Sequence, residues 1–304
     1  MRCLIAPSAA VVLLASVLGC GGRPTQEPGD DSSAKQPPPA DAAKAAEDEP
    51  EPPKITGEDE LRGALNAKNP GFWGDVPFEK SGRGIAILQL NDPAIRDISP
   101  LAGLPLEKLD LRGCSITDIS PLRGMKLTIL ALEDTRVKDL SPLKGMPLER
   151  LYLNNTPVED VSPLEGAPLE YLYLFGTKVS DLRPLAKAPT LQQLWLNRCP
   201  VRDISPLKGL PLESLTLDET DVEDLSPLEG SSIQRLQIVD SKVTDLSVLK
   251  TLPQLGRLVF TPSRIKKGIE AARSVPKIGT TIDEAERPGS AAAFWARYDA
   301  GKFK

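Results

Sequence analysis

Eight aspartates recur along this chain of 304 residues at an almost constant interval, and a stacked row of carboxylates could bind calcium. The step between them is 21 residues, except for one step of 22 where Thr190 is an extra residue. Calcium needs several oxygens around each ion, and no loop rich in Gly and Asp supplies them. We therefore predict that these side chains accept backbone N–H groups in a recurring turn. They are Asp97, Asp118, Asp139, Asp160, Asp181, Asp203, Asp224 and Asp245.

The residue types of the chain also give little support for catalysis. Histidine is absent, which removes the commonest general base and metal ligand. The four cysteines, Cys3, Cys20, Cys114 and Cys199, form no CxxC pair. Walker loops, GxSxG motifs and kinase motif sets are also missing. We predict that the protein is not an enzyme, has no cofactor or metal, and, with a formal net charge of −5, binds no nucleic acid.

The aspartates belong to a repeated unit, seen clearly in Pro147–Ala167, PLERLYLNNTPVEDVSPLEGA. Side chains alternate along a strand, so Leu151 and Leu153 point to one side and Tyr152 points to the other. Apolar residues recur at the same positions in every unit. The unit predicts one coil of a solenoid, made of a short strand, a turn, a one-turn helix and a return.

The far side of each coil has room for only a short helix. In the same unit, Ser162 is a natural N-cap and Pro163 a natural first helical residue. Gly166 and Pro168 then end the helix within about one turn. We expect a 3₁₀-like segment here and not a full α-helix.

The array of units over residues 84–263 resembles leucine-rich repeats, most of all the internalin-like class with its IxDIxPLxxL segment. The form VxDLSPLKGMPLxxLxLxxT is similar to arrays of planctomycete-type bacteria, where such repeats also occur fused to Ser/Thr kinases. The resemblance implies an α/β solenoid that is right-handed and curved. It would have a parallel sheet of roughly eight or nine strands on the concave face, 3₁₀ segments on the convex face and helical caps at both ends.

One position departs from the family pattern, because the usual asparagine is replaced by hydroxyl and thiol side chains. The residues at this position are Cys114, Thr135, Thr156, Thr177, Cys199, Thr220, Ser241 and Ser263. Cys114 and Cys199 lie four coils apart, or about 20 Å at a strand spacing of ~4.8 Å, which is beyond disulfide reach. We predict that both are buried and inert.

The N-terminal part of the chain is expected to direct the protein to a membrane. Residues 1–19 read as a secretory signal, because Arg2 precedes a short apolar run. The ending Val17-Leu18-Gly19-Cys20 resembles the bacterial lipobox, whose cysteine is lipidated. Residues 20–53 would then be the lipidated Cys20 followed by a disordered tether rich in Pro, Ala and acidic residues. The expected location is the cell envelope, facing the periplasm or the exterior, with the lipid as the only membrane contact.

Residues 54–83 are predicted to cap the N-terminal end of the array. Thr56 and Asp59 suggest a capping-box start for a helix over about 57–67. The sequence Asn69-Pro70-Gly71 should stop it. Four apolar residues then offer cover for the open end of the solenoid: Phe72, Trp73, Val76 and Phe78.

Residues 264–304 are predicted to cap the other end. They read as a helix over 266–274, a strand over 277–282 and a second helix over 290–299. The order of residues resembles the tail that closes these bacterial arrays. We expect Phe294 and Trp295 to plug the last coil.

The candidate binding site is the outward row of strand positions. Five aromatic side chains fall on three adjacent coils, and Tyr, Trp and Arg are the types that dominate interface hot spots. These aromatics could instead stabilise the sheet by pairing across strands, and both effects can act together. The predicted partner-binding residues are Arg150, Tyr152, Asn154, Tyr171, Tyr173, Phe175, Trp195, Asn197 and Arg198.

These observations favour a protein–protein interaction module that binds a partner on its concave face. A glycan or cell-wall polymer is the alternative ligand, since aromatic rows also stack on sugar rings. A passive envelope scaffold is the third possibility. The resemblance to kinase-fused arrays adds signalling with a separate kinase, which no residue supports directly.

Overall fold

The computed structural model describes residues 55, 57–81 and 84–303. They belong to one compact unit, Pro52–Lys304. The predictions for the signal, the lipidated Cys20 and the tether lie outside the described residues. Among the residues described, no helix is both long enough and apolar enough to span a membrane.

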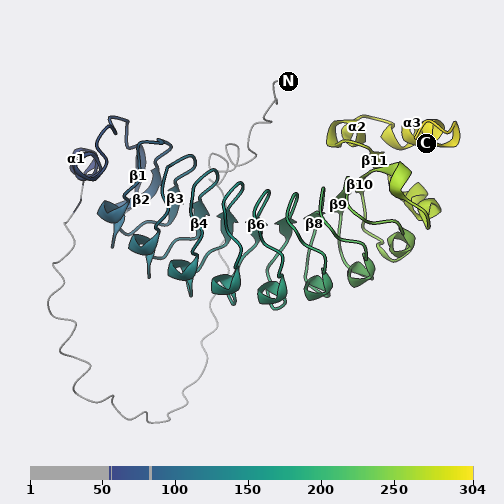
Figure 1. The fold of residues 1–304 in the computed structure, drawn as a ribbon, viewed down its shortest axis with the longest axis horizontal. Coiled ribbons are helices and arrows are strands. Elements are labelled where there is room, and N and C mark those ends of the chain that lie inside the picture. Colours follow the sequence, from purple (N-terminus) through teal and green to yellow (C-terminus); the bar gives the residue numbers. More distant parts are fainter. Residues whose placement is uncertain (1–54, 56, 82–83, 304) are drawn as a thin grey trace, which may run out of the picture. The chain divides into compact units, whose positions relative to one another are not determined.

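The unit is built on a single sheet of eleven strands that follow one another in chain order. Figure 1 shows them along the inner side of an arc, with the short helices along the outer side. The strands are β1 Phe78–Ser81, β2 Gly84–Gln89, β3 Lys108–Asp110, β4 Ile129–Ala131, β5 Arg150–Tyr152, β6 Tyr171–Tyr173, β7 Gln193–Trp195, β8 Ser214–Thr216, β9 Arg235–Ile238, β10 Arg257–Phe260 and β11 Lys277–Gly279.

The sheet is longer than the eight or nine strands expected from the repeats, because both ends add strands. The N-terminal addition, β1, pairs antiparallel with β2, whereas β2 to β11 are parallel. Each strand lies in register with the next, so that Leu151 is paired with Leu172 and Leu172 with Leu194. All three leucines are fully buried. Burial of equivalent leucines in successive coils gives one continuous apolar core.

The outer side of the arc carries the predicted 3₁₀ segments. They are η2 Ser99–Leu101, η3 Ser120–Leu122, η4 Ser141–Leu143, η5 Ser162–Leu164, η6 Arg183–Leu185, η7 Ser205–Leu207, η8 Ser226–Leu228, η9 Ser247–Thr251, η10 Pro262–Arg264 and η11 Ile269–Ser274. Three α-helices lie at the ends: α1 Glu58–Lys68, α2 Ile282–Glu286 and α3 Ser290–Asp299.

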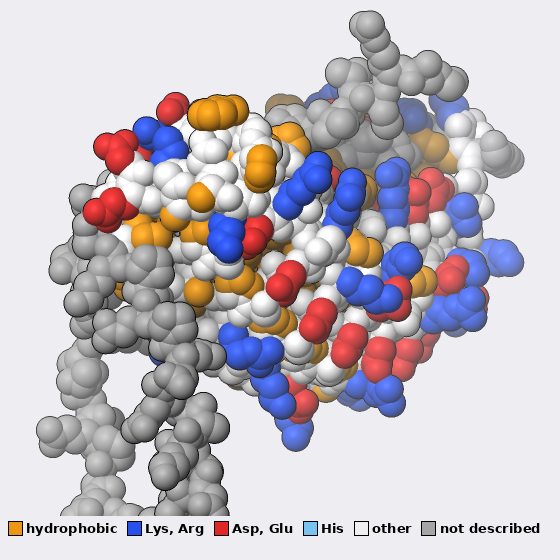
Figure 2. All heavy atoms as spheres, turned by 60° about the vertical axis from the view of Figure 1, so that its left-hand side comes forward, with side chains coloured by type: hydrophobic (Ala, Val, Ile, Leu, Met, Phe, Trp, Pro, Cys, Tyr) orange, Lys and Arg blue, Asp and Glu red, His pale blue; other side chains and the backbone are white. Residues whose placement is uncertain are grey.

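The recurring aspartates hold the turns into these segments, as predicted. Asp160 shows the pattern: its Oδ1 accepts the Ser162 N–H at 2.8 Å and its Oδ2 accepts the Ser162 hydroxyl at 2.8 Å. All eight aspartates accept the equivalent N–H group. The prediction that Ser162 is the N-cap is wrong, because the serine is the first residue of the segment and the aspartate before it satisfies its N–H. A regular row of acidic side chains crosses successive coils in Figure 2.

The one extra residue, Thr190, is absorbed on the outer side of its coil. After η6 the backbone at Ala186 stays helical, with φ −59° and ψ −19°, whereas the equivalent residue Glu165 is extended. The Thr190 hydroxyl donates to the Leu169 carbonyl at 2.9 Å. The strand register is unchanged, with Tyr171 still paired with Gln193.

The N-terminal cap is joined to the first coil by a buried asparagine, Asn69, whose sequence context predicts only a helix stop. Its Nδ2 donates to the Asp97 carbonyl at 2.8 Å, and its Oδ1 accepts the N–H groups of Arg96 and Asp97. The prediction that Trp73 covers the solenoid end is wrong, because its side chain is 81% exposed. Phe72 and Val76 are buried as expected.

The start of α1 also differs from the prediction. Gly57 is its N-cap and makes no side-chain cap. Thr56 lies outside the described residues. Asp59 is turned to Arg62, whose Nη1 donates to its Oδ1 at 3.1 Å on the exposed side of the helix.

The C-terminal cap matches the prediction in part. The segment 266–274 is a 3₁₀ turn over Ile269–Ser274 preceded by Gly268, and the strand 277–282 ends at Gly279 because α2, which was not predicted, begins at Ile282. The helix over 290–299 is present as α3. Phe294 and Trp295 are buried, and the ring of Phe294 packs on Phe260 of β10 with centroids 5.5 Å apart. These residues do plug the last coil.

Candidate functional site

A second apolar cluster lies on the concave face of the sheet, separate from the main core. Its buried members are Ile129, Ala131, Tyr152 and Tyr173, and the half-buried Tyr171 and Trp195 pack against them. We call these six residues the aromatic cluster. They come from β4 to β7, at outward positions of strands whose leucines face the core. The sequence therefore placed these side chains on the correct face.

The rings of the aromatic cluster pack on one another. Tyr173 stacks on Trp195 with centroids 3.9 Å apart and an interplanar angle of 4°, and it meets Tyr152 edge-on at 5.0 Å. The Tyr173 hydroxyl donates to Gln193 Oε1 at 3.0 Å. Tyr152 and Tyr173 are each only 3% exposed. They therefore form the floor of the surface although they occupy outward positions, and cross-strand pairing is part of their role.

Burial keeps the tyrosines of this floor neutral. Loss of solvation raises the pKa of Tyr152, and it raises the pKa of Tyr173 further. A buried phenolate would be costly, whereas a neutral hydroxyl needs only one hydrogen-bond partner. The accessible parts of the surface are the outer residues Tyr171, Phe175 and Trp195, which are half-buried.

Two arginines lie over the rings at the rim. The guanidinium carbon of Arg150 is 4.7 Å from the centroid of Tyr171, and that of Arg198 is 5.3 Å from Phe175. Such contacts are worth about 0.5–1 kcal/mol at exposed sites. Arg198 also pairs with Glu219, with its Nε 2.8 Å from Oε1. Nε and Nη1 of Arg150 are buried and have no hydrogen-bond acceptor among the described residues.

The two predicted asparagines are used within the solenoid. Asn154 Nδ2 donates to Glu133 at 3.1 Å, and its Oδ1 accepts the Phe175 N–H at 3.1 Å. Asn197 Nδ2 donates to Asp218 Oδ2 at 2.9 Å, and its Oδ1 accepts the Thr216 hydroxyl. Both side chains thus join neighbouring coils. Their contribution to binding would be indirect, by fixing the surface beside them.

A buried ionic network at the N-terminal side of the aromatic cluster was not predicted. Asp110 and Glu133 are 2% and 3% exposed. Arg112 lies between them, with Nη2 2.5 Å from Asp110 Oδ2 and Nε 3.6 Å from Glu133 Oε2. The hydrogen bonds to Asp110 raise the pKa of Arg112. In the sequence, this network is indicated only by three charged residues at outward positions of adjacent coils.

On the other side of the cluster, Asp218 has an unusual protonation equilibrium. Its Oδ1 accepts the Val239 N–H at 2.8 Å and its Oδ2 accepts the amide of Asn197. Burial raises the pKa of its carboxyl to about 6, and the nearby charges of Glu219 and Asp240 add to the effect.

We expect this carboxyl to make stability depend on pH in an identifiable window. The folded pKa lies above the unfolded value, so between about pH 4 and pH 6 the folded state holds a proton that the unfolded chain has lost. Raising the pH through this window therefore lowers the free energy of unfolding. In Asp218→Asn this contribution is absent, so the stability of wild type relative to the variant should fall as pH rises from 4 to 6.5, then stay level. Urea titrations of both proteins measure it, and a difference that does not change with pH would contradict the assignment.

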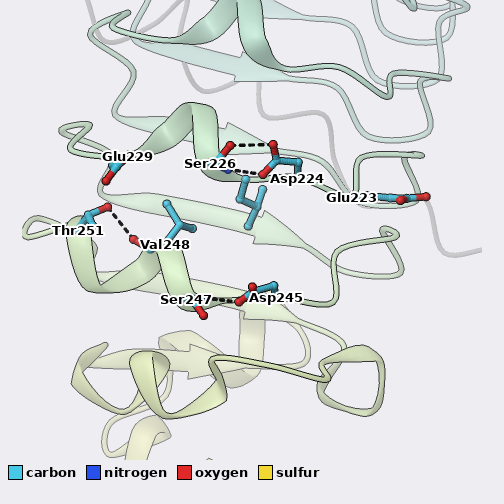
Figure 3. Close-up of a pocket in the computed structure, with 9 residues that line it drawn as sticks. Glu223, Asp224, Ser226, Glu229, Asp245, Ser247, Val248 and Thr251 are labelled. Carbon is cyan, nitrogen blue, oxygen red and sulfur yellow. Dashed lines mark hydrogen bonds between the residues drawn. The ribbon is translucent and has the colours of Figure 1, made fainter.

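On the convex side, a groove lies between η8 and η9, and Figure 3 shows how its carboxylates are used. Asp224 and Asp245 each accept a hydrogen bond from the serine two residues later, Ser226 and Ser247. The Thr251 hydroxyl is turned to the carbonyl of Val248 at 2.8 Å. Within the described part of the chain, no group of three or more His, Cys, Asp or Glu is arranged to hold a metal ion.

The predicted spine of hydroxyl and thiol groups is present, except at its end. Thr135, Thr156 and Thr220 are buried, and each donates to the carbonyl three residues earlier at 2.7 Å. Cys114 and Cys199 are 1% exposed, and their thiols donate to carbonyls of the preceding coil. Ser263 is exposed in η10, because Pro262 is the buried residue of that turn.

Both thiols should be unreactive in the folded protein. Burial raises the pKa of Cys114 to about 12, and it also raises the pKa of Cys199. With iodoacetamide at pH 8 we expect native alkylation at these two residues to be at least about a hundredfold slower than in urea, because the thiolate is the reactive form. Peptide mass spectrometry reads each site separately. Comparable rates in native and unfolded protein would show that the spine opens.

The chain is similar to known proteins in both sequence and structure. The family described as leucine rich repeats (2 copies) matches residues 169–209, and that described as leucine rich repeat matches residues 105–125. No curated protein matches the sequence. Among solved structures, internalin C2 from Listeria monocytogenes is 32% identical with a TM-score of 0.55, over 59% of this chain and 81% of that one.

A second structure, internalin F from Listeria monocytogenes, is 26% identical with a TM-score of 0.52, over 74% of this chain and 75% of that one. The short strands, 3₁₀ segments and capped ends are those of a leucine-rich-repeat solenoid. Domains of this kind are typically interaction modules without enzymatic activity. The repeats, the solenoid and the similarity to internalin C2 together show that this chain belongs to the leucine-rich-repeat family.

Proposed function

We propose that this protein is a non-catalytic interaction module that binds a partner protein on the concave face of its repeats. The observation that carries the proposal is the aromatic cluster, which is apolar, lies on the open face and is separate from the core. Leucine-rich-repeat domains generally bind proteins. A solenoid gains most of its stability from its buried leucines. A second cluster on the concave face of the sheet is therefore available for recognition.

The cluster has the features of a protein-binding hot spot. Half-buried Tyr171, Phe175 and Trp195 lie beside Arg150 and Arg198, and aromatic and arginine side chains are enriched at such spots. Trp195 is already stacked on Tyr173, so it loses little conformational freedom on binding.

The same geometry weighs against a glycan or cell-wall polymer as ligand. A sugar-binding row needs free ring faces along the surface. Here Trp195 covers one face of Tyr173, and Tyr152 and Tyr173 are almost fully buried. A passive envelope scaffold has no need for the cluster beyond its contribution to stability.

Site-specific photocrosslinking in intact cells tests the proposal. A photoreactive amino acid at Tyr171 or Trp195 should give discrete adducts with a protein. Lys187, exposed on the convex side after η6, is the matched control position and should give none. Equal adducts from all three positions, or none at Tyr171 and Trp195, would count against concave-face binding. A carbohydrate adduct would support the alternative ligand, and a kinase adduct would identify a signalling partner.

We also propose that the module is held in the cell envelope by a lipid on Cys20. The proposal rests on the lipobox-like sequence before Cys20 and on the composition of residues 20–53. The signal over residues 1–19 would be removed and the tether would separate the repeats from the membrane. Metabolic labelling with a fatty acid should mark the protein, and Cys20→Ala should abolish the label. Labelling retained in that variant would contradict the anchor.

A further inference from the structure

Three basic residues lie side by side at the C-terminal end of the concave face. Arg235, Arg257 and Lys277 are the first residues of β9, β10 and β11, and the strand register pairs Arg235 with Arg257 and Arg257 with Lys277. Neighbouring strands are ~4.8 Å apart, so the three side chains leave the sheet within about 10 Å of one another. Like charges directly opposite each other in a sheet are destabilising. We call these residues the basic row.

One carboxylate, Glu286 of α2, faces the basic row and forms ion pairs with two of its residues. It accepts hydrogen bonds from Arg257 Nη1 and from Lys277 Nζ, the latter at 2.7 Å. Hydrogen bonding to Lys277 and then to Arg257 lowers the pKa of Glu286, so it is ionised at neutral pH. Arg235 has no ion pair among the described residues. The row therefore keeps a local excess of two positive charges in a chain whose formal net charge is −5.

The basic row borders a groove of about 460 Å³. Gln234 and Gln254 line it, and Gly256 leaves space because it has no side chain. The Nε of Arg257 is buried and has no hydrogen-bond acceptor among the described residues. The groove thus carries uncompensated positive charge beside one unsatisfied, buried guanidinium nitrogen.

The residue immediately before each strand also differs at the C-terminal end of the sheet. In the coils of β3, β5, β6 and β8 this residue is acidic: Glu107, Glu149, Glu170 and Glu213. At β9, β10 and β11 it is Gln234, Gly256 and Pro276. Glutamate therefore recurs at this position, with Thr128 and Gln192 as exceptions at β4 and β7, only as far as β8, and the basic row begins at the next strand.

We propose that the basic row is a second subsite of the concave face, which binds side-chain carboxylates of an acidic segment of the partner protein; this rests on the proposed function. Arginine binds carboxylates in a bidentate manner, and two of the three cations are arginines. The cations are spread along a row and do not converge on one point. That arrangement fits successive acidic side chains along a peptide and does not enclose a single phosphate.

Binding of a fluorescein-labelled octaglutamate peptide to the full-length protein tests the subsite. We expect anisotropy to show binding at 25 mM NaCl that weakens at 250 mM. Arg235→Gln should weaken it about fivefold, because one charge pair contributes on the order of 1 kcal/mol. Lys208→Gln is the matched control, since it removes the same charge from an exposed position on the convex side and should leave binding unchanged.

A second variant should raise the affinity for octaglutamate instead of lowering it. Glu286→Gln removes the carboxylate that competes with the ligand, so octaglutamate should bind about threefold more tightly. A merely structural role for Glu286 predicts weaker binding or none. Equal affinities for wild type and Arg235→Gln, or equal losses in Arg235→Gln and Lys208→Gln, would overturn the subsite. Displacement of octaglutamate by an equal concentration of inorganic phosphate would also overturn the assignment to an acidic peptide.

The photocrosslinking experiment separates this proposal from the proposed function. If Trp195 gives partner adducts but octaglutamate does not bind, the interaction module stands and the subsite fails. If octaglutamate binds through Arg235 but Trp195 gives no adduct, the subsite stands and the proposed use of the aromatic cluster fails. If both hold, Arg235→Gln should reduce the yield of the Trp195 adduct.

Discussion

Replacing Gly268 with alanine should lower the free energy of unfolding by about 3 kcal/mol or more. Gly268 precedes η11 with φ +74°, a left-handed conformation that costs other residues roughly 1–2 kcal/mol. An added Cβ would also lie 2.3 Å from the Ser247 nitrogen and 2.7 Å from the Leu246 carbonyl carbon. Both are backbone atoms of the adjacent coil, so the clash cannot be relieved by a side-chain rotation and the last coils must move apart.

Gly289 provides the matched control for this prediction. Its φ is +72°, almost the same as that of Gly268, but an added Cβ would have no atom within 4 Å. Gly289→Ala should therefore show only the conformational cost of roughly 1–2 kcal/mol. Urea denaturation gives the total change, and hydrogen exchange should show early loss of protection in β10 and β11 in the Gly268 variant alone. Equal losses of stability in the two variants would mean that the close packing at Gly268 is unimportant.

The second large effect is expected at Tyr173, in the floor of the aromatic cluster. Tyr173→Ala should cost about 3 kcal/mol, in the range of large aromatic-to-alanine changes at buried sites. The variant loses a ring that is 3% exposed, its stacking on Trp195 and its edge contact with Tyr152. Aromatic pairs add roughly 0.5–1.5 kcal/mol each beyond the buried area.

Tyr173→Phe separates packing from hydrogen bonding. It keeps the ring and removes only the hydroxyl that donates to Gln193, so it should cost about 1 kcal/mol. Thermal or urea unfolding monitored by tryptophan fluorescence measures both variants. If Tyr173→Ala is as stable as Tyr173→Phe, the ring does not contribute to the fold. The expected instability also means that Tyr173→Ala is unsuitable for a binding test, whereas Trp195 and Tyr171 at the rim are suitable.

Much of the architecture was predictable because the physical signal repeats. Alternation along a strand fixes that Leu151 and Leu153 face the core and Tyr152 faces outward, whatever the partner coil contains. The spacing of Asp160 from Ser162 similarly fixes a local turn. Interactions within one coil need only local sequence, and eight copies make the pattern unmistakable.

Interactions that depend on geometry between coils were not predictable in the same way. An outward position does not determine exposure, and Tyr173 is buried because Trp195 of the next coil lies flat upon it. Trp73 is exposed for the converse reason: no described part of the cap covers it. The charge of the basic row depends on Glu286, which comes from a helix outside the repeats. Asn69 likewise gains its role only through contact with the first coil.

The extra residue Thr190 has a practical consequence. Its coil lengthens on the convex side by one residue while Tyr171 and Gln193 keep their pairing. The loop over residues 186–190 therefore tolerates a change of length without any change in the strand pairing on the concave side. A short tag or a fluorophore placed there would lie on the convex side and leave the concave face free. The same tolerance makes it the natural point at which to graft an additional coil.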